Sequence, residues 1–551
     1  MNDNVNNPAA GGSPSTAQAT MERAVALHQR GELAQAAALY LEVIDAEPDH
    51  PHALHMLGVY ALQSGDLQAA LDLIERAAAL LPHEAAPQLN LGAVLKRLER
   101  YDAALACLRR ALEIEPEHVT ALNNYGSTLL AMGRGADALP WLERALRLDP
   151  AFADGWNNLG NALHELQRHA EALLCLDRAL LLQAQHPQAL FNRANTLQML
   201  NRSGEALRSY ALALRHDPEH VDANVNMAVC RLLDGDLEHG WPQFEWRWRK
   251  PAYQALRPAA PPLWHGQGAL AGKTLLVYAE QGLGDTLQFC RYVPLLAARG
   301  ARVILRVQPA LVTLLATLAG AHQVLADDAP LPPCDLQCPL MSLPLAFATR
   351  LSTIPADTPY LRADARLAAA WGARLGSDTT SKPRIGIAWA GSAGHANDRQ
   401  RSMALIELRR IVTPAADFIS LQKDARAVDM VQLDGDGDNG GDGGNGGGGI
   451  RQFAALQTDF AATAALVAQM DLVICVDTSI AHLAGALGKP VWLLLPFAPD
   501  WRWMLGRDDS PWYPTMRLFR QPRAGDWDAV LEQVVAALGL RLAGHAAPAI
   551  S

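Results

Sequence analysis

The sequence PHEAAPQLNLGAVLKRLERYDAALACLRRALEIEP, residues 82–116, decides the organisation of the first half of the chain. It begins and ends with proline and carries a glycine and an alanine at fixed places between them. Each of these residues recurs at intervals of 34 positions. The rows are Pro48, Pro82, Pro116, Pro150 and Pro218, Gly58, Gly92, Gly126 and Gly160, and Ala36, Ala70, Ala104, Ala138, Ala172 and Ala206. A period of this length predicts a repeat architecture.

Each unit of this repeat is expected to be a helix, a short turn and a second helix. The small side chains allow two helices to touch, and the proline ends the second helix. One unit cannot bury its own apolar face, so we expect the units to stack into a superhelix with a concave groove. The pattern resembles the tetratricopeptide repeat, most clearly in the fifth unit at Trp156, Leu159, Gly160, Ala172 and Ala179.

The repeats are expected to occupy residues 17–250, after a disordered N-terminus at 1–16. Six units run from about Ala17 to Pro218, and a degenerate seventh runs from Val221 to about Lys250. In the seventh unit Gly240 replaces the alanine, and Arg247 stands in an apolar slot.

A row of asparagines follows the same period on the first helix of each unit. Its members are Asn90, Asn124, Asn158, Asn192 and Asn226. In this repeat family that helix faces the groove, and a carboxamide offers both donors and an acceptor to a peptide backbone. The row could therefore hold an extended polypeptide acceptor, in a way similar to the repeats of the nucleocytoplasmic O-linked N-acetylglucosamine transferases. The alternative is that asparagine is simply common at this repeat position.

The pattern changes near residue 250. A Trp-rich stretch, 240–251, is expected to cap the last repeat or to join it to the next domain, with stacking on a ligand as the alternative. A Pro-rich linker then occupies 251–271. From Lys273 onward apolar runs alternate with helical segments, one of them at 310–318, and the runs lie at 274–279, 302–307, 384–389, 417–422, 472–476 and 491–495. This alternation predicts two doubly wound parallel sheets, with ligands at the carboxyl ends of the strands.

Three loops that follow predicted strands carry residues suited to an anion. The first is Gly282-Leu283-Gly284-Asp285, which permits close backbone approach to a ligand or merely makes a tight turn. The second contains Ser392, Arg399 and Arg401, with Lys423 as a further basic residue nearby in sequence.

The third loop is Asp477-Thr478-Ser479, with His482 one turn into the following helix. Exposed amides and hydroxyls at a helix start could hold a diphosphate. A single histidine at this place is as often structural as functional.

The loop at Asp285, the loop at Arg401 and the Asp477-Thr478-Ser479 stretch with His482 resemble the family 9 glycosyltransferases, whose best-known members are the ADP-heptose lipopolysaccharide heptosyltransferases. The resemblance covers roughly 272–540. It implies a GT-B fold of two Rossmann-like lobes, which we place at 272–545, with the nucleotide-sugar on the C-terminal lobe.

The resemblance also implies roles for individual residues. Asp285 corresponds to the proposed base, and Arg401 stands where heptosyltransferases often carry a lysine that meets the diphosphate. Asp477, Thr478, Ser479 and His482 correspond to the nucleotide site.

The chemistry can also be stated from the residues alone. An acceptor hydroxyl must lose its proton as it attacks the anomeric carbon, and a carboxylate such as Asp285 can take it. Arg401, with Arg399 or Lys423, and the Ser479 amide could stabilise the departing diphosphate. One displacement inverts the anomeric centre. We therefore expect a metal-independent transferase that uses a nucleotide-diphosphate sugar as substrate and needs no cofactor.

A Gly- and Asp-rich segment at 434–449 superficially resembles a calcium loop. Its first aspartates fit the opening of an EF-hand, but the sixth place is Asn439 instead of glycine and the twelfth is Asn445 instead of glutamate. A flexible insertion is the better interpretation.

Composition limits the class of protein. The chain has 551 residues, of which 50% are hydrophobic and 19% charged, as in a globular protein of two or three domains. Its 47 basic and 57 acidic residues give a net charge of −10, which argues against a nucleic-acid partner. Seven scattered cysteines form no disulfide framework, and we find no secretory signal and no apolar run of about 18 residues. We expect a cytoplasmic protein without a transmembrane segment.

The leading hypothesis is a glycosyltransferase that recruits a polypeptide or glycan acceptor through its repeats. The alternative is a non-catalytic scaffold for protein–protein interaction, whose C-terminal domain only binds a nucleotide or is degenerate. Asp285, Arg401 and Asp477 together favour the enzyme, because a decayed site usually loses one such residue. A third possibility, a lipopolysaccharide-core enzyme at the inner membrane face, lacks a basic amphipathic patch for docking.

Overall fold

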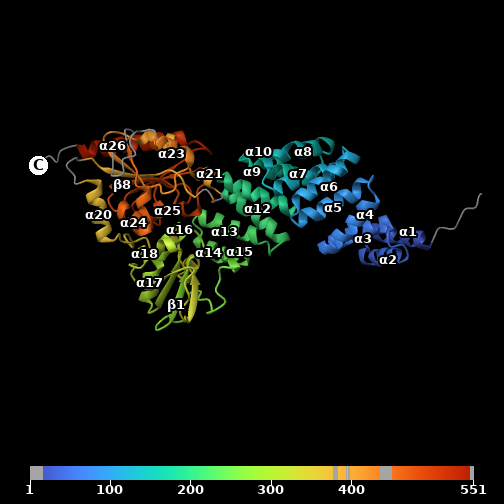
Figure 1. Cartoon of the computed structure of the whole chain (residues 1–551), viewed down its shortest axis with the longest axis horizontal. Coiled ribbons are helices and arrows are strands. Elements are labelled where there is room, and N and C mark those ends of the chain that lie inside the picture. Colours follow the sequence, from blue (N-terminus) through green and yellow to red (C-terminus); the bar gives the residue numbers. More distant parts are fainter. Residues whose placement is uncertain (1–15, 377–381, 393, 395–396, 435–448, 547–551) are drawn as a thin grey trace, which may run out of the picture. The chain divides into compact units, whose positions relative to one another are not determined.

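The computed structural model describes residues 16–376, 382–392, 394, 397–434 and 449–546. The chain divides into two compact units, residues 1–197 and 198–551 (Figure 1). The expected disordered N-terminus and the Gly/Asp-rich insertion lie almost wholly outside the described residues. Among the described helices, none has the length and apolarity needed to cross a membrane.

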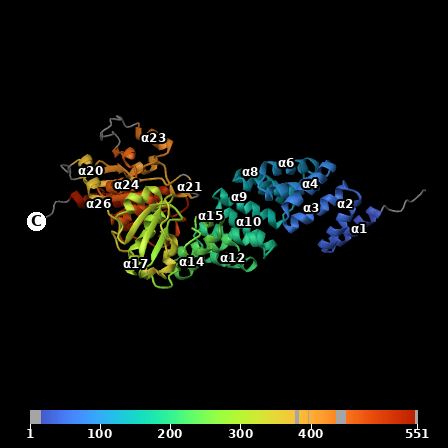
Figure 2. The ribbon, with the colours of Figure 1, turned by 60° about the horizontal axis from the view of Figure 1, so that its bottom comes forward.

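The first unit consists of helix pairs, as the period predicts. Neighbouring pairs lie side by side in a stack (Figures 1 and 2). The helices are α1 (Thr16–Gln29), α2 (Leu33–Ala46), α3 (Pro51–Ser64), α4 (Leu67–Leu80), α5 (Ala85–Arg97), α6 (Tyr101–Ile114), α7 (Val119–Ala131), α8 (Gly135–Leu148), α9 (Ala153–Glu165), α10 (His169–Leu182) and α11 (Pro187–Met199), which runs just past the division. The helical repeat fold is confirmed.

The row of glycines marks the closest approach of the two helices in a pair. A Cβ atom added to Gly92 would lie 2.6 Å from Cγ of Leu108, and one added to Gly126 would lie 2.7 Å from Cγ of Leu142. Since real Cβ atoms do not approach so closely, only glycine fits there without a shift of the neighbouring helix. The expected reason for the small-residue rows is confirmed.

A row of histidines, which the sequence analysis missed, caps the starts of several first helices. His50, His118, His186 and His220 each accept a hydrogen bond at Nδ1 from the backbone N–H three residues later. They are separated by multiples of the same 34-residue period. The 34-residue period therefore places helix-capping residues as well as the residues that pack between helices.

The second unit begins with helices that continue the repeat pattern and pack on the α/β part. They are α12 (Ser203–His216), α13 (Val221–Leu233), α14 (Leu237–Phe244), a 3₁₀ turn η1 (Glu245–Arg249) and the short α15 (Pro251–Gln254). Trp241 of α14 is 2% exposed, lies edge-on to Trp501 at 5.3 Å and donates from Nε1 to the carbonyl of Thr349 at 3.1 Å. The expected role of the Trp-rich stretch in joining the last repeat to the next domain is confirmed.

Two parallel sheets follow, as expected. The first has the order β3-β2-β1-β4, from strands β1 (Thr274–Tyr278), β2 (Arg302–Val307), β3 (Ala321–Ala326) and β4 (Leu336–Pro339). The second has the order β10-β9-β8-β5-β6-β7, from β5 (Arg384–Ala388), β6 (Asp417–Ser420), β7 (Ile450–Arg451), β8 (Leu472–Val476), β9 (Val491–Leu495) and β10 (Met516–Arg520). The expected α/β region is thereby confirmed.

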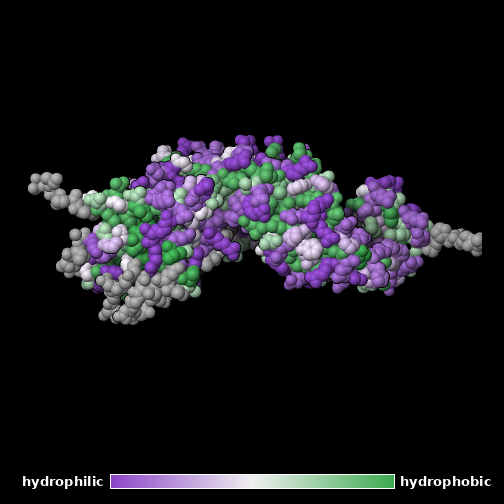
Figure 3. All heavy atoms as spheres, turned by 90° about the horizontal axis from the view of Figure 1, so that it is seen from above, coloured by the Kyte–Doolittle hydropathy of each residue, from purple (hydrophilic) through white to green (hydrophobic). Residues whose placement is uncertain are grey.

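Helices cover both sheets. They are α16 (Leu283–Phe289), α17 (Val293–Ala298), α18 (Val312–Leu315), α19 (Leu343–Ala346), α20 (Ala365–Leu375), α21 (Asp398–Arg401), α22 (Leu405–Leu408), α23 (Ala427–Asp434), α24 (Phe460–Val467), α25 (Ser479–Ala486) and α26 (Trp527–Ala546). The helix expected at 310–318 is shorter, because a 3₁₀ turn at Pro309–Leu311 precedes α18. The face seen in Figure 3 mixes hydrophilic and hydrophobic residues.

Candidate functional site

The first predicted loop lies at the carboxyl end of β1, where the chain enters α16. Gly282 is the N-cap residue of that helix. The carboxylate of Asp285 turns back and accepts a hydrogen bond from the Gly282 N–H at 2.8 Å. The glycines thus place the Asp285 side chain at the start of the helix, at the edge of the sheet where ligands of such folds bind.

The third predicted loop lies at the carboxyl end of β8 and contacts the first. Thr478 caps α25 and accepts at Oγ1 from the N–H of Ile480 at 3.0 Å. Helix α16 packs against α25, and a Cβ atom on Gly284 would lie 2.9 Å from Cδ2 of His482 and 3.7 Å from Cα of Ser479. A side chain at position 284 would separate the two loops, so here the glycine is required for a close approach.

The second predicted loop reaches the third through Arg401. Its guanidinium donates to the carbonyl of Asp477 at 3.1 Å. It lies over Gly391, where an added Cβ would be only 2.5 Å from Nη2 of Arg401. Its Nε lies 3.8 Å from Oδ1 of Asp398 and makes no hydrogen bond within the described residues. Arg401 therefore links the second loop to the residue that precedes the N-cap of α25.

Three other predicted donor-binding residues stand apart. Ser392 and Arg399 are exposed, and Lys423 is exposed and donates to the carbonyl of Thr458 at 3.3 Å. Over the described ranges, no hydrogen bond or ion pair joins these side chains to Asp285 or Asp477. The structure thus brings together Gly284, Asp285, Arg401, Asp477, Ser479 and His482 but not this group.

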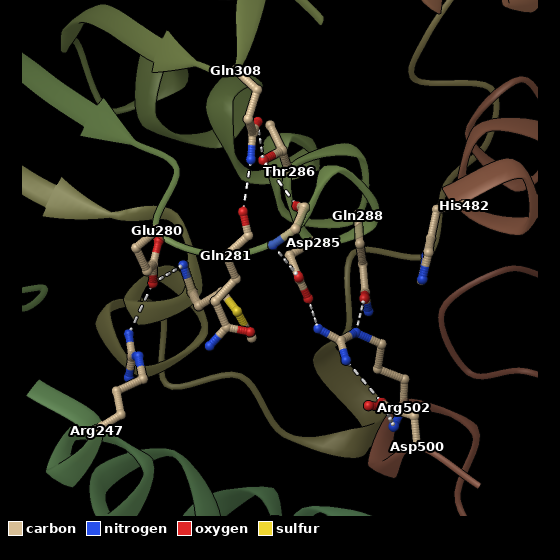
Figure 4. Close-up of polar contacts among 12 residues, drawn as sticks. Arg247, Glu280, Gln281, Asp285, Thr286, Gln288, Gln308, His482, Asp500 and Arg502 are labelled. Atoms are coloured by element: carbon tan, nitrogen blue, oxygen red, sulfur yellow. Dashed lines mark hydrogen bonds and ion pairs between the residues drawn. The ribbon is translucent and has the colours of Figure 1, made fainter. Parts of the chain in front are cut away.

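Arg502, which the sequence analysis missed, links the two sheets at the site (Figure 4). It follows β9, in the 3₁₀ turn η8 (Trp501–Trp503), and its side chain is 8% exposed. It pairs with Asp285, donates to Asp500 at 2.8 Å and donates from Nε to Gln288 at 2.6 Å. The strand at 491–495 was predicted. Because ligands bind at the carboxyl ends of such strands, the residues that follow it, Arg502 among them, could have been proposed as site residues.

Burial sets the protonation of the groups around α25. Burial, helped by the nearby Asp500 carboxylate, raises the pKa of Asp477 to about 6. Burial lowers the pKa of His482 well below its usual value, and the charge of Arg502 acts in the same direction. His482 is therefore neutral near pH 7, with Nδ1 2.9 Å from the Tyr513 hydroxyl and its ring stacked on Trp503. The His482 side chain is therefore an uncharged imidazole that Tyr513 and Trp503 hold in place.

Asparagines of the repeat row bond mainly to the preceding unit. Asn158 donates to Oδ1 of Asn123 at 2.8 Å, and Asn192 donates to Oδ1 of Asn157 at 2.9 Å. Nδ2 of Asn90 lies 2.8 Å from Nε2 of His55, and the Asn226 side chain forms a hydrogen bond with Tyr210. The side-chain amide of Asn124 makes no hydrogen bond within the described residues. These contacts favour a structural use for most of the row, while peptide binding stays a prediction.

Family models match both parts of the chain. Tetratricopeptide repeat models match residues 83–151, 7–51, 23–88 and 126–189. The model of glycosyltransferase family 9 (heptosyltransferase) matches residues 454–494, a segment that contains the third loop and all of α25.

Protein FlbA of Caulobacter vibrioides is 27% identical over 336 residues, which are 56% of this chain and 54% of FlbA. The chain thus spans about half the length of that curated relative. Among solved structures, the MamA protein aligns at 21% identity with a TM-score of 0.28 and covers 31% of this chain and 93% of its own. The Cut9–Hcn1 assembly of the APC/C aligns at 18% identity with a TM-score of 0.37 and covers 39% and 42%.

Proposed function

We propose that this chain, in which tetratricopeptide repeats precede a segment that matches the family 9 glycosyltransferases, transfers a sugar from a nucleotide-diphosphate donor to an acceptor recruited by the repeats. One observation carries the proposal. A carboxylate, two arginines and a helix start come from four separate strand ends of two sheets and meet at Asp285, Arg401, Arg502 and Ser479. Such convergence is typical of a ligand site in parallel α/β folds.

The proposed reaction is one inverting displacement. The acceptor oxygen forms a bond to the anomeric carbon while its proton passes to the Asp285 carboxylate. The bond between that carbon and the diphosphate oxygen breaks, and the diphosphate leaves with the electron pair. Arg401 and the N–H groups at the start of α25 stabilise its charge. The neutral His482 orients the start of that helix without adding charge.

A second candidate function is supported by the partners of Asp285. This carboxylate already binds the Gly282 N–H and Arg502, as a purely structural carboxylate would. In that case the chain is a repeat scaffold for protein–protein interaction, with a C-terminal domain that binds a nucleotide without turning it over.

The two proposals separate in a thermal-shift titration of the full-length chain with UDP, ADP and GDP sugars, followed by product analysis. A bound ligand raises the melting temperature in proportion to the logarithm of its excess over the dissociation constant. We expect the sugars of one nucleotide class to raise the melting temperature of the unmodified chain. This stabilisation should be lost in Arg401→Ala. It should be retained in the control Arg410→Ala, because Arg410 is an exposed arginine that pairs with Asp528. Stabilisation without any sugar transfer or hydrolysis supports the scaffold, and no stabilisation by any donor contradicts both nucleotide-binding proposals.

A further inference from the structure

A charge from the end of the degenerate seventh repeat is buried beneath the loop that carries Asp285. Arg247 lies in η1, and its side chain is 1% exposed. It donates from Nη2 to Oε1 of Glu280 at 3.0 Å, and the Glu280 side chain is 0% exposed. Glu280 stands two residues after the end of β1 and two before Gly282. The ion pair therefore connects the last repeat directly to the first residues of the loop that carries Asp285.

The guanidinium of Arg247 is held on several sides. Nη1 donates to Oε1 of Glu245 at 2.6 Å, and Nη2 donates to the Ser342 hydroxyl at 2.8 Å. The same Glu280 oxygen also accepts from the N–H of Met341 at 3.1 Å. Among the described residues, Arg247 thus faces two carboxylates, and these contacts fix both the guanidinium and Glu280.

The rest of the loop is held by other groups (Figure 4). Gln308 donates to the carbonyl of Gln281 at 2.7 Å and accepts from the Thr286 hydroxyl at 2.9 Å. Arg502 holds Asp285 itself. Glu280, Gln281 and Asp285 are thus three anchoring points. The Arg247 partner of Glu280 comes from the segment that continues the repeats, and so does one partner of Gln281, whose Nε2 donates to the Tyr253 hydroxyl at 3.2 Å.

Energetics indicate what this pair is for. Removing two charges from water costs about as much as their attraction returns, so a buried ion pair adds little net stability over apolar residues of the same size. The pair is better explained by the single geometry that it imposes. In a reacting complex a displacement of about 1 Å can cost about 100-fold in rate.

We propose that Arg247 is a positioning residue, which acts through Glu280 to fix the loop that presents Asp285 to the acceptor. This inference rests on the proposed function for the role of Asp285, and it assigns the seventh repeat to the catalytic unit. Burial of both side chains excludes water from the contact.

The test is hydrogen–deuterium exchange of the full-length chain without any ligand. In Arg247→Met, we expect the amides of residues 281–286 to exchange about tenfold faster, with unchanged exchange in β8 and α25. Arg247→Lys, which restores one positive donor, should recover a large part of the protection. The control is Arg249→Met, since Arg249 lies in the same turn, is 49% exposed and pairs with Glu219 at the surface.

Two results would overturn the proposal: unchanged exchange at 281–286 in folded Arg247→Met, or an equal acceleration throughout 272–540 that lysine does not reverse. If Arg247→Met does not fold, Glu280→Gln provides the same readout, because glutamine keeps the shape and can accept from Met341. Addition of UDP, ADP or GDP is a separate measurement on the same variants. Absence of nucleotide binding would contradict the proposed function and leave the exchange result as it stands.

Discussion

Two of the contacts of Asp285 orient its carboxylate. Its Oδ2 accepts from the Gly282 N–H, and its Oδ1 pairs with Arg502. An ionised carboxylate offers about four lone-pair directions and can accept several hydrogen bonds at once. The Gly282 contact sets the direction of the carboxyl group, and the Arg502 contact holds it between the two sheets.

Asp285→Asn should separate chemistry from donor binding. The amide oxygen can still accept from Gly282, but the side chain cannot take a proton. We expect the transfer rate to fall by at least about 100-fold, while donor affinity stays within about tenfold, since a base acts in the transition state. The measurement is single-turnover transfer beside a donor titration. Full activity in this variant would remove Asp285 from the mechanism.

Gly284→Ala should test the contact between the first and third loops. Its new Cβ would lie 2.9 Å from the His482 ring, so α16 and α25 must move apart. We expect the free energy of unfolding to fall by about 1–3 kcal/mol in urea titrations. Gly539→Ala in α26 is the matched control, because nothing lies within 4 Å of that position. Equal stability of the two variants would contradict the packing described.

Within the repeat helices, the asparagine row divides into two kinds of residue. Asn192→Ala leaves Oδ1 of Asn157 without its donor, and Asn157 is 4% exposed. We expect a loss of about 1–3 kcal/mol in the free energy of unfolding. Asn124→Ala should change stability by less than about 0.5 kcal/mol, which makes it the variant for testing peptide binding. Equal losses in both variants would contradict this division.

Helix α9 carries a histidine that makes the repeats sensitive to acid. Burial, together with His169, whose ring lies 4.8 Å away, lowers the pKa of His164 to about 4. Between pH 6.5 and 4 the unfolded chain therefore binds a proton that the folded chain does not, and the free energy of unfolding should fall by roughly 3 kcal/mol.

Urea unfolding at pH 7 and pH 4.5 measures this effect. In His164→Gln, which keeps a partner for Thr196 but cannot titrate, the dependence on pH should be smaller. The same pH dependence in both proteins would exclude His164 as its source.

Elements were predictable where their pattern is local. The helix pairs repeat every 34 residues, and β1, β2, β5, β6, β8 and β9 are short apolar runs. Four strands that the sequence did not reveal are atypical. β3 reads AHQVLA, β4 reads LQCP, β7 has two residues, and β10 places two arginines among five residues. Burial by neighbouring elements, which a single sequence does not display, decides such segments.

The site was predictable in part for the same reason. Asp285 and Asp477 follow strands with clear patterns, whereas Arg502 pairs with a residue 217 positions away. The sequence showed Arg247 only as a charged residue at a position that is apolar in the other repeats. Its partner Glu280 lies outside the repeats, next to a strand of the α/β region, so the repeat pattern could not indicate the pair. Contacts between distant segments were the missing information.

On the scale of the whole molecule, α13 and α14 belong with the α/β part. Trp241→Ala should destabilise residues 198–551 by about 3–5 kcal/mol, because a large side chain that is 2% exposed leaves a cavity. Hydrogen exchange should report the loss in β1 and α16 as well as in α14. Trp156→Ala in α9 is the comparison, and its effect should stay within residues 1–197. A loss confined to α14 would contradict the assignment of this helix to the second unit.

The histidine caps of the repeats also decide where protons sit. Because Nδ1 of His50, His118, His186 and His220 accepts from a backbone amide, each neutral ring must be the Nε2–H tautomer. At His186 that proton points to Asp154. The same tautomer therefore recurs at four helix starts, at places set by the 34-residue period.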